Sequence, residues 1–512
     1  MNLLKAMGTV SVMTFLSRIT GLIREVLKAA IFGAGAQVDA FEAAFRLPNL
    51  LRRLFAEGAF SQAFVPVLTE YNRQRGVDAT KELVSKTTAL LGLALLVVTV
   101  IGVIAAPILV YVLAGSFAKT PGKVELTTLL IRIVFPYIFF ISLVSLSGSI
   151  LNVYRKFAVP AVTPVLLNFS FIGAALFLTP YCDPPVLALA MGVAVGGLIQ
   201  LLWQLYPLYK LGMLVRPRLE WKHEGVRRIL KLMLPAVLGV SAAQISILIN
   251  TQLAAFLGDG RISWITYADR LMEFPSALLG VALGTVLLPS LAKHHSDANP
   301  KKYAELLDWG LRLALLLALP ATLGLMLLTV PVIATLYQYG HFSVEDVWQT
   351  RVALLGYGLG LPALIMIKIL APGFYARQDT KTPVRFSLIA IFVTQAISIS
   401  TMWFIGHAGL TLAISIGACC NALLLFHQLW RRKIYTPNAG WLPFMLKLSI
   451  ALLLLGITLY FLSGDPETWL SVSWKEKLPR LLLVMTAGAA VYFITLRLLG
   501  FRIQNFARRE GE

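Results

Sequence analysis

Long apolar stretches separated by short polar segments dominate this chain of 512 residues. A helix needs about 20 apolar residues to cross a hydrocarbon core roughly 30 Å thick. Such windows can be placed fourteen times, so the pattern predicts an all-α polytopic membrane protein with fourteen transmembrane helices. The expected spans are 8–32, 38–58, 88–114, 127–151, 158–179, 185–208, 228–257, 262–289, 307–330, 350–373, 383–405, 409–430, 441–463 and 479–500.

Composition agrees with this class and changes the interpretation of the charge. Hydrophobic residues make up 58% of the chain, charged residues 14%, and the formal net charge is +20. These values exclude a soluble or nucleic-acid-binding protein, because an excess of Lys and Arg in a membrane protein follows first from positive-inside topology. Basic residues gather after even-numbered spans, which predicts that both termini are cytoplasmic. We expect the N-terminal apolar stretch to be a retained first span and not a signal peptide.

The chain also matches itself when it is shifted by about 223 to 226 residues. Arg46 falls on Arg270, and prolines at four positions fall on prolines. Six spans per copy would make the repeats parallel, as in transporters that bind substrate between two lobes. The predicted architecture is two six-helix lobes around a central cavity plus two C-terminal helices. Its expected parts are an N-lobe at 1–220, a C-lobe at 221–435, and an extra helix pair with a cytoplasmic tail at 436–512. A duplicated scaffold without transport is the alternative.

Ionisable side chains interrupt several of the apolar spans. Each costs about 2.5–3.5 kcal/mol near the bilayer centre on insertion scales, and such residues usually face a polar cavity. The pattern therefore predicts a cavity for a charged or strongly polar substrate. The residues concerned are Arg18 and Arg24 in the first span, Asp269, Arg270 and Glu273 in the eighth, and Lys368 in the tenth.

The second span carries a polar stripe at helical spacing. A cavity-lining helix is the preferred interpretation, because the equivalent helix of the second repeat is polar at the same level. An amphipathic helix at the membrane interface is the alternative. The stripe consists of Asp39, Glu42, Arg46, Asn49, Arg53 and Glu57, with Arg52 beside it.

Asp269 and Glu273 lie four residues apart, with Arg270 adjacent. This spacing lets Arg270 exchange between a carboxylate and a bound anion, although a permanent salt bridge between lobes is the alternative. Arginine suits phosphate because its planar fork donates paired hydrogen bonds and stays charged when desolvated. The arginine bias therefore predicts a phosphorylated or polyanionic substrate.

Other chemistry finds little support in the sequence. The chain has three cysteines and lacks the GxxxxGK[ST] and HExxH motifs, so we expect no disulfide framework, metal site or other cofactor. Any ATP-driven mechanism would need a partner subunit. The sequence identifies neither a coupling ion nor an oligomeric state.

Three long motifs resemble the MurJ (MviN) family of bacterial lipid II flippases, within the multidrug/oligosaccharidyl-lipid/polysaccharide exporter superfamily. They are SRITGLIREVLKAAIFGAGAQVDAFEAAFRLPNLLRRLFAEGAFSQAFVP, YADRLMEFPSALLGVALGTVLLPSL and KILAPGFYARQDTKTPV. The resemblance implies a transporter, not an enzyme, in the bacterial inner membrane. It would move undecaprenyl-pyrophosphate-linked disaccharide-pentapeptide to the periplasmic leaflet for peptidoglycan synthesis. Spans thirteen and fourteen would form a groove for the lipid tail.

The family's functional positions coincide with residues already singled out. The resemblance implies substrate binding by Arg18, Arg24, Arg52, Arg53, Arg270 and Lys368, and gating or salt-bridge roles for Asp39, Asp269 and Glu273. Expected partners are lipid II, membrane lipids and other cell-wall synthesis proteins, and no nucleic acid.

Two competing functions are kept open. A multidrug cation antiporter of the same superfamily would need a cavity dominated by carboxylates. A membrane glycosyltransferase acting on the same lipid would need an unpaired carboxylate in an extracytoplasmic loop, for which Asp183, Asp465 and Glu467 are candidates.

Overall fold

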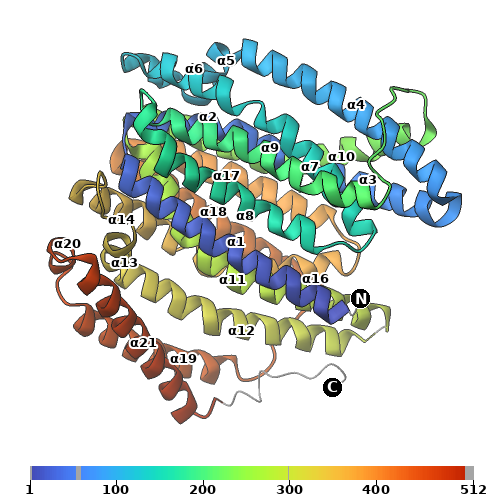
Figure 1. The fold of residues 1–512 in the computed structure, drawn as a ribbon. Helices are drawn as coiled ribbons and strands as arrows, with labels where there is room; N and C mark the ends of the chain where they lie inside the picture. The colour runs from blue at the N-terminus through green and yellow to red at the C-terminus, as the bar shows by residue number, and fades with distance from the viewer. Residues whose placement is uncertain (1–2, 54–58, 298, 502–512) are drawn as a thin grey trace. The chain divides into compact units, whose positions relative to one another are not determined.

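The computed structural model describes residues 3–53, 59–297 and 299–501 and divides the chain into two compact units, Met1–Ser263 and Trp264–Glu512. Every regular element in these ranges is helical. In a membrane this is expected, because a helix satisfies its backbone hydrogen bonds internally. Figure 1 shows the helices of both units with their labels.

The first unit contains ten helices within its described residues. They are α1 (Leu3–Phe32), α2 (Ala36–Arg52), α3 (Ala59–Glu70), α4 (Gly76–Ile104), α5 (Ala106–Ala114), α6 (Lys123–Val134), α7 (Tyr137–Val153), α8 (Ala158–Gly173), α9 (Leu187–Lys210) and α10 (Glu224–Phe256). One π-helical turn, Tyr71–Arg75, connects α3 to α4, and another, Ala174–Leu178, extends α8.

Helix α11 starts at the end of the first unit and continues into the second. The helices from there onward are α11 (Arg261–Ser296), α12 (Pro300–Leu327), α13 (Thr329–Leu336), α14 (Val344–Gly358), α15 (Leu361–Leu370), α16 (Pro372–Tyr375), α17 (Lys381–Ile405), α18 (His407–Arg431), α19 (Trp441–Ser463), α20 (Thr468–Ser471) and α21 (Trp474–Leu498). Helix α19 packs against α21, and α17 packs against α18.

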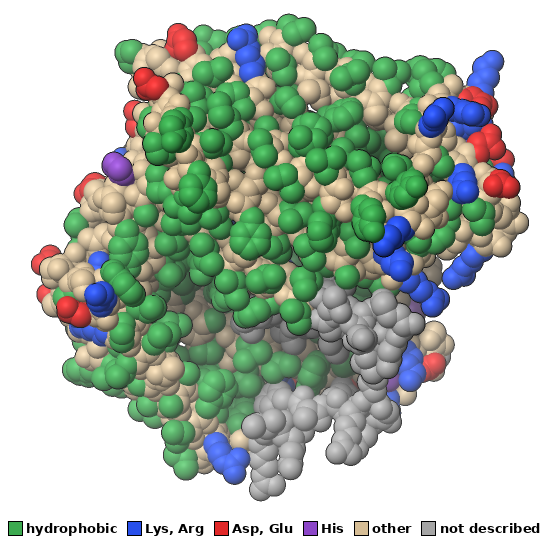
Figure 2. All heavy atoms as spheres, viewed as in Figure 1, with side chains coloured by type: hydrophobic (Ala, Val, Ile, Leu, Met, Phe, Trp, Pro, Cys, Tyr) green, Lys and Arg blue, Asp and Glu red, His purple; other side chains and the backbone are tan. Residues whose placement is uncertain are grey.

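Ten helical segments among the described residues are long and apolar enough to cross a membrane. They match the expected spans apart from the first, second, seventh and eighth, which correspond to α1, α2, α10 and α11. The all-helical polytopic class is thus confirmed, and the count of fourteen stays a prediction. The face in Figure 2 agrees with a lipid-facing surface, since hydrophobic side chains cover most of it and charged ones are sparse.

Two of the four proline pairs that the repeat aligns lie at equivalent helix breaks. Pro107 follows the break between α4 and α5, and Pro331 follows the break between α12 and α13. Pro136 separates α6 from α7, and Pro362 is the second residue of α15, which begins just after α14 ends. Proline removes a backbone donor and clashes with the preceding turn, so it fixes such breaks. These matching breaks support the repeat inferred from the sequence.

The compact units do not divide at the expected lobe boundary of residue 220. Helix α10 packs against α3 and α5, so it belongs to the first unit. Two ion pairs join its start to the end of α3 and the π-helical turn: Arg228 to Glu70 at 2.8 Å and Arg75 to Glu224 at 3.0 Å. The division into lobes at 1–220, 221–435 and 436–512 stays a prediction.

A buried carboxylate fixes the segment that leads to the C-terminal helix pair. Asp308 on α12 accepts hydrogen bonds from Tyr435 Oη and Trp441 Nε1, both at 2.7 Å, and pairs with Arg312 at 2.8 Å. The guanidinium of Arg312 lies 5.0 Å from the ring of Trp441. Residues on both sides of the linker are thereby held on α12.

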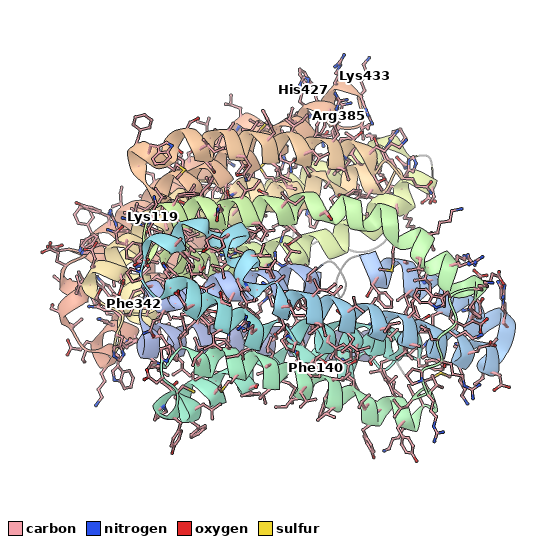
Figure 3. The ribbon with its side chains drawn as sticks, turned by 90° about the horizontal axis from the view of Figure 1, so that it is seen from above. Lys119, Phe140, Phe342, Arg385, His427 and Lys433 are labelled. Atoms are coloured by element: carbon pink, nitrogen blue, oxygen red, sulfur yellow. The ribbon has the colours of Figure 1, made fainter. Side chains whose placement is uncertain are left out.

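A second polar cluster joins the start of α17, which contains the sequence KTPV, to the residue that follows α18. Asp379 accepts from the backbone nitrogen and Oγ1 of Thr382, at 3.0 and 2.7 Å, and pairs with Arg432 at 2.6 Å. Figure 3 shows Arg385, His427 and Lys433 at the same end of the α17–α18 hairpin. This end therefore presents the basic side chains of two neighbouring polar segments.

Small residues allow α17 and α18 to approach closely, as in many membrane helix pairs. A Cβ added at Gly417 would lie 1.9 Å from Thr394 Oγ1. We expect Gly417→Ala to destabilise the protein by about 1–3 kcal/mol through overpacking. Thermal unfolding in detergent measures this effect. Gly173→Ala is the matched control, because that helical position has open space, and there alanine should stabilise by about 0.5–1 kcal/mol. Equal effects of the two changes would contradict the packing argument.

The Asp379 cluster predicts a pH dependence. Partial burial raises the pKa of Asp379, but hydrogen bonds from Thr382 and the ion pair with Arg432 outweigh it and lower the pKa to about 2. A lowered folded-state pKa stabilises the fold above about pH 4, and the stabilisation is lost as the pH falls toward 2. We expect Asp379→Asn to cost about 1 kcal/mol at neutral pH, because solvent screens the pair.

Thermal midpoints of both proteins between pH 3 and 7 provide the measurement. The difference should shrink toward acid pH, whereas Glu345→Gln, at an exposed position, should leave the profile unchanged. A difference that does not depend on pH would exclude ionisation of Asp379 as the cause.

Candidate functional site

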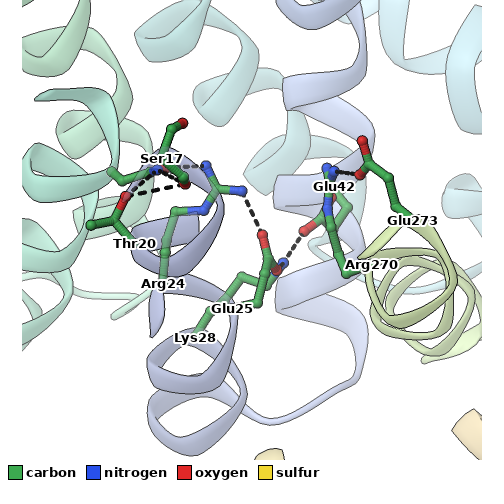
Figure 4. Close-up of polar contacts among 9 residues, drawn as sticks. Ser17, Thr20, Arg24, Glu25, Lys28, Glu42, Arg270 and Glu273 are labelled. Atoms are coloured by element: carbon green, nitrogen blue, oxygen red, sulfur yellow. Dashed lines mark hydrogen bonds and ion pairs between the residues drawn. The ribbon is translucent and has the colours of Figure 1, made fainter. Parts of the chain in front are cut away.

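Three charged side chains of α1 and one of α2 form a mostly buried row of ion pairs, here called the ionic chain. Its members are Arg24, Glu25, Lys28 and Glu42. Arg24 Nη2 lies 2.6 Å from Glu25 Oε1, and Lys28 Nζ lies 2.5 Å from Glu25 Oε2. Lys28 Nζ also lies 2.5 Å from Glu42 Oε1 on α2. Figure 4 shows these contacts, which link two cations and two carboxylates in sequence. The formal charges of the four groups cancel.

Burial makes this pairing necessary. The Lys28 side chain is 2% exposed, and those of Glu25 and Glu42 are 4% and 9% exposed. An isolated buried ion is strongly unfavourable, whereas a hydrogen-bonded pair is tolerated. Arg24 is the most exposed member, at 14%. Of the four side chains of the ionic chain, Arg24 is therefore the one that a ligand can reach most easily.

Arg24 also contacts α8. Its Nη1 donates to Asn168 Oδ1 at 3.1 Å, and its guanidinium lies 5.2 Å from the ring centroid of Phe171. Its Nε is buried and has no hydrogen-bond partner in the described part of the chain. Arg18 lies about two turns earlier on α1 and is exposed. The two predicted arginines of α1 thus occupy different environments.

Asp39 at the start of α2 contacts the first turn of α11. Its side chain is fully buried and accepts from the backbone nitrogens of Gly260 and Ser263, at 2.6 and 2.9 Å, and from Ser263 Oγ at 2.6 Å. Lys123 Nζ lies 3.5 Å away. The backbone donors belong to the first turn of α11, which has no intrahelical acceptors for them. Asp39 therefore fixes α2 to the start of α11.

The rest of the polar stripe on α2 is less buried. Arg46, Arg52 and Arg53 are half-buried, and Nε and Nη2 of Arg52 donate to Asn49 Oδ1 at 3.1 and 3.0 Å. Glu57 lies outside the described residues. The stripe is thus divided into a buried first half and a more accessible second half. A helix lying at the membrane interface would instead expose its polar face along its whole length.

The second unit contains a separate charged group on α11. Arg270 Nη1 pairs with Glu273 Oε2 at 2.9 Å, and these side chains are 29% and 36% exposed. Asp269 is half-buried. Lys368 on α15 donates from Nζ to the carbonyl of Ser276 at 3.3 Å, one turn beyond Glu273. Four of the predicted residues therefore lie on or beside one stretch of α11.

Sequence reasoning missed several residues of the first unit. Glu25 and Lys28 were detectable, because their three-residue spacing on a helix favours an ion pair. Lys123 and Asn168 gave no comparable signal. Each lies far along the chain from its partner, and only the fold brings them together.

Comparisons with known proteins agree over nearly the whole chain. The sequence profile of the family described as "Lipid II flippase MurJ" matches residues 28–479. The lipid II flippase MurJ of Burkholderia cenocepacia is 49% identical over 514 residues, which covers 99% of this chain and 100% of that protein. This chain belongs to the MurJ family of lipid II flippases.

Further relatives and structures support the MurJ assignment. The probable lipid II flippase MurJ of Vibrio cholerae is 43% identical over 98% of this chain and 97% of that protein. A solved structure titled "Lipid II flippase MurJ, inward closed conformation" has a TM-score of 0.80 and 26% identity, and covers 96% of this chain and 98% of its own. A multidrug resistance MATE transporter has a TM-score of 0.68 at 16% identity, covering 82% and 94% of the two chains, which shows a shared fold. The family is thus one of membrane transporters, as the motifs implied.

The buried chain predicts an asymmetry between its central cation and a surface pair. Lys28→Met removes the cation that Glu25 and Glu42 share, and we expect a loss of about 3–5 kcal/mol in unfolding free energy. The control Arg228→Ala breaks an exposed pair and should cost about 1 kcal/mol or less. Unfolding of purified protein by denaturing detergent measures both. If Lys28→Met lowers the unfolding free energy as little as the control does, the ionic chain does not stabilise the fold.

Proposed function

We propose that this protein moves lipid II, undecaprenyl-pyrophosphate-linked disaccharide-pentapeptide, from the cytoplasmic to the periplasmic leaflet of the bacterial inner membrane. The observation that carries the proposal is the 49% identity over essentially the full length to a lipid II flippase. The chemistry of α1 supports it independently. Arg24 is a reachable arginine with an unused buried donor, and guanidinium groups bind pyrophosphate oxygens in pairs.

Binding at Arg24 requires an exchange of anions. Glu25 occupies Nη2 of Arg24, so a pyrophosphate oxygen must replace it there. Glu25 would not be stranded by the exchange, because Lys28 holds its other oxygen at 2.5 Å. The cost of releasing Arg24 is therefore lower than that of leaving a buried carboxylate without a counter-charge. Glu25 is thus the counter-ion of Arg24 until the pyrophosphate of the substrate displaces it.

Further positions are assigned from the family resemblance and the structure. We assign substrate binding to Arg18, Arg24, Arg52, Arg53, Arg270 and Lys368, and gating or salt-bridge roles to Asp39, Asp269 and Glu273. The Arg270–Glu273 pair supports an exchange like that at Arg24, since both side chains are partly accessible. The bonds from Gly260 and Ser263 to Asp39 support gating, because they join α2 to α11.

The transport cycle is alternating access between two six-helix lobes. Two further C-terminal spans bring the total to fourteen, and both termini are cytoplasmic. The polar head group cannot cross hydrocarbon unaided, whereas the lipid tail stays in the bilayer while the cavity opens sideways. An inside-negative potential favours outward movement of an anion by about 2.3 kcal/mol per charge per 100 mV. This energy allows transport without ATP hydrolysis.

Among the described residues, the buried carboxylates of α1 and α2 give the cation antiporter alternative no support. An antiporter needs carboxylates that can take up a cation from solution. The described carboxylates Glu25 and Glu42 instead share Lys28 at 2.5 Å, and Asp39 lies against Lys123. The likeness to MATE transporters at 16% identity concerns the fold alone.

Reconstitution into proteoliposomes tests the function. Labelled lipid II should be translocated unchanged, at a rate that falls when the membrane potential is collapsed. Arg24→Ala should lower the rate at least tenfold, whereas Arg132→Ala, an exposed arginine of α6, should not. Polymerisation of the lipid or export of a cationic dye in place of translocation would overturn the proposal. A translocation rate that is unchanged when the membrane potential is collapsed would contradict only the proposal that the potential supplies the energy.

A further inference from the structure

A single buried amide connects α8 to α1 at the level of Arg24. Asn168 is 5% exposed, and its Oδ1 accepts from Arg24 Nη1 at 3.1 Å. Its Nδ2 donates to the carbonyl of Ser17 at 3.1 Å and to Thr20 Oγ1 at 3.0 Å. This pattern fixes the orientation of the amide, because the reverse orientation would place its NH₂ against a guanidinium donor. Asn168 thus holds α8 against a defined turn of α1 through hydrogen bonds.

Phe171 supports the same guanidinium one turn later on α8. It is 3% exposed, and its ring centroid lies 5.2 Å from Arg24 Cζ, within the range of a cation–π contact. An edge contact with Phe41 of α2, at 5.8 Å between centroids, holds the ring. The aromatic face therefore restricts Arg24 from a second direction without adding charge.

These contacts leave part of the guanidinium for a ligand. Asn168 occupies one terminal nitrogen and Glu25 the other, while Nε has no partner in the described part of the chain. An anion that displaces Glu25 from Nη2 would find Nε beside it, and this pair of donors matches two oxygens of a phosphate. The contact with Asn168 is compatible with that exchange because it uses the other nitrogen.

We infer that Asn168 and Phe171 are positioning residues that hold Arg24 in the orientation in which it binds the pyrophosphate of the substrate. This inference rests on the proposed function. Both residues are neutral, so they fix the guanidinium without lowering its attraction for an anion. A carboxylate at position 168 would keep an acceptor for Arg24 but compete with the substrate. The absence of charge on Asn168 and Phe171 therefore contributes to the selectivity of Arg24 for anions.

Equilibrium binding of lipid II to the full-length protein in nanodiscs tests the inference. Asn168→Leu should weaken binding about tenfold, and Asn168→Asp at least as much despite its nearly identical shape. Gln200→Leu is the matched control. Gln200 is also a buried amide, 2% exposed, that faces α8 through a hydrogen bond to the Thr163 carbonyl. We expect Gln200→Leu to change binding less than twofold, even if its thermal midpoint falls as far as that of Asn168→Leu.

Double-mutant cycles separate positioning from general damage. Asn168→Leu should have no further effect on binding once Arg24→Ala is present. With Arg18→Ala its effect should remain about tenfold, because Arg18 has no contact with the amide among the hydrogen bonds described for Asn168. Phe171→Leu should follow the same pattern with a smaller, severalfold effect.

The possible failures are distinguishable. If Arg24→Ala binds lipid II normally, the proposed pyrophosphate site is wrong. If Arg24→Ala binds weakly but Asn168→Leu binds normally, only the positioning inference is wrong. Equal weakening by Asn168→Leu and Gln200→Leu, or additivity of Asn168→Leu with Arg24→Ala, would also overturn the inference.

Discussion

Charge neutralisation in a low-dielectric interior is the constraint on which the described site depends. Lys28 is almost completely buried between Glu25 and Glu42, and removing any one of these charges would leave another without compensation. The pairing fixes α1 against α2. In the proposed function, Glu25 is also the carboxylate that Arg24, at the accessible end of the ionic chain, exchanges for another anion. The stability of the helix pair and the binding of substrate then depend on the same ion pairs.

Asp39 illustrates the same constraint in a different form. Its fully buried carboxylate is stabilised by Lys123 and by backbone and hydroxyl donors at the start of α11. A helix start offers several unsatisfied N–H groups, so one carboxylate can compensate for them. Because these bonds depend on where α11 begins, any movement of that helix end relative to α2 would break them together. Such a contact has two states, formed or broken.

The sequence predicted the helical membrane class and most helix positions because apolar windows and prolines act locally. It also singled out Arg24, Arg270 and Glu273 as candidates, since charges within apolar spans are conspicuous. It did not predict the partners of these charges. Asp39 was expected to have a gating or salt-bridge role, but the sequence did not indicate that Gly260, Ser263 and Lys123 contact it. Those contacts join residues far apart in the chain, and only tertiary packing determines them.

The difference between Glu25 and Asn168 follows from the same reasoning. Both bind the guanidinium of Arg24, but one is charged and the other neutral. A carboxylate at both places would neutralise Arg24 twice over and suppress anion binding. A neutral amide at both places would leave buried charge uncompensated when no substrate is present. One exchangeable carboxylate and one permanent neutral acceptor satisfy both conditions. In the proposed function, this division of roles lets a partly buried arginine be stable without substrate and still bind an anion.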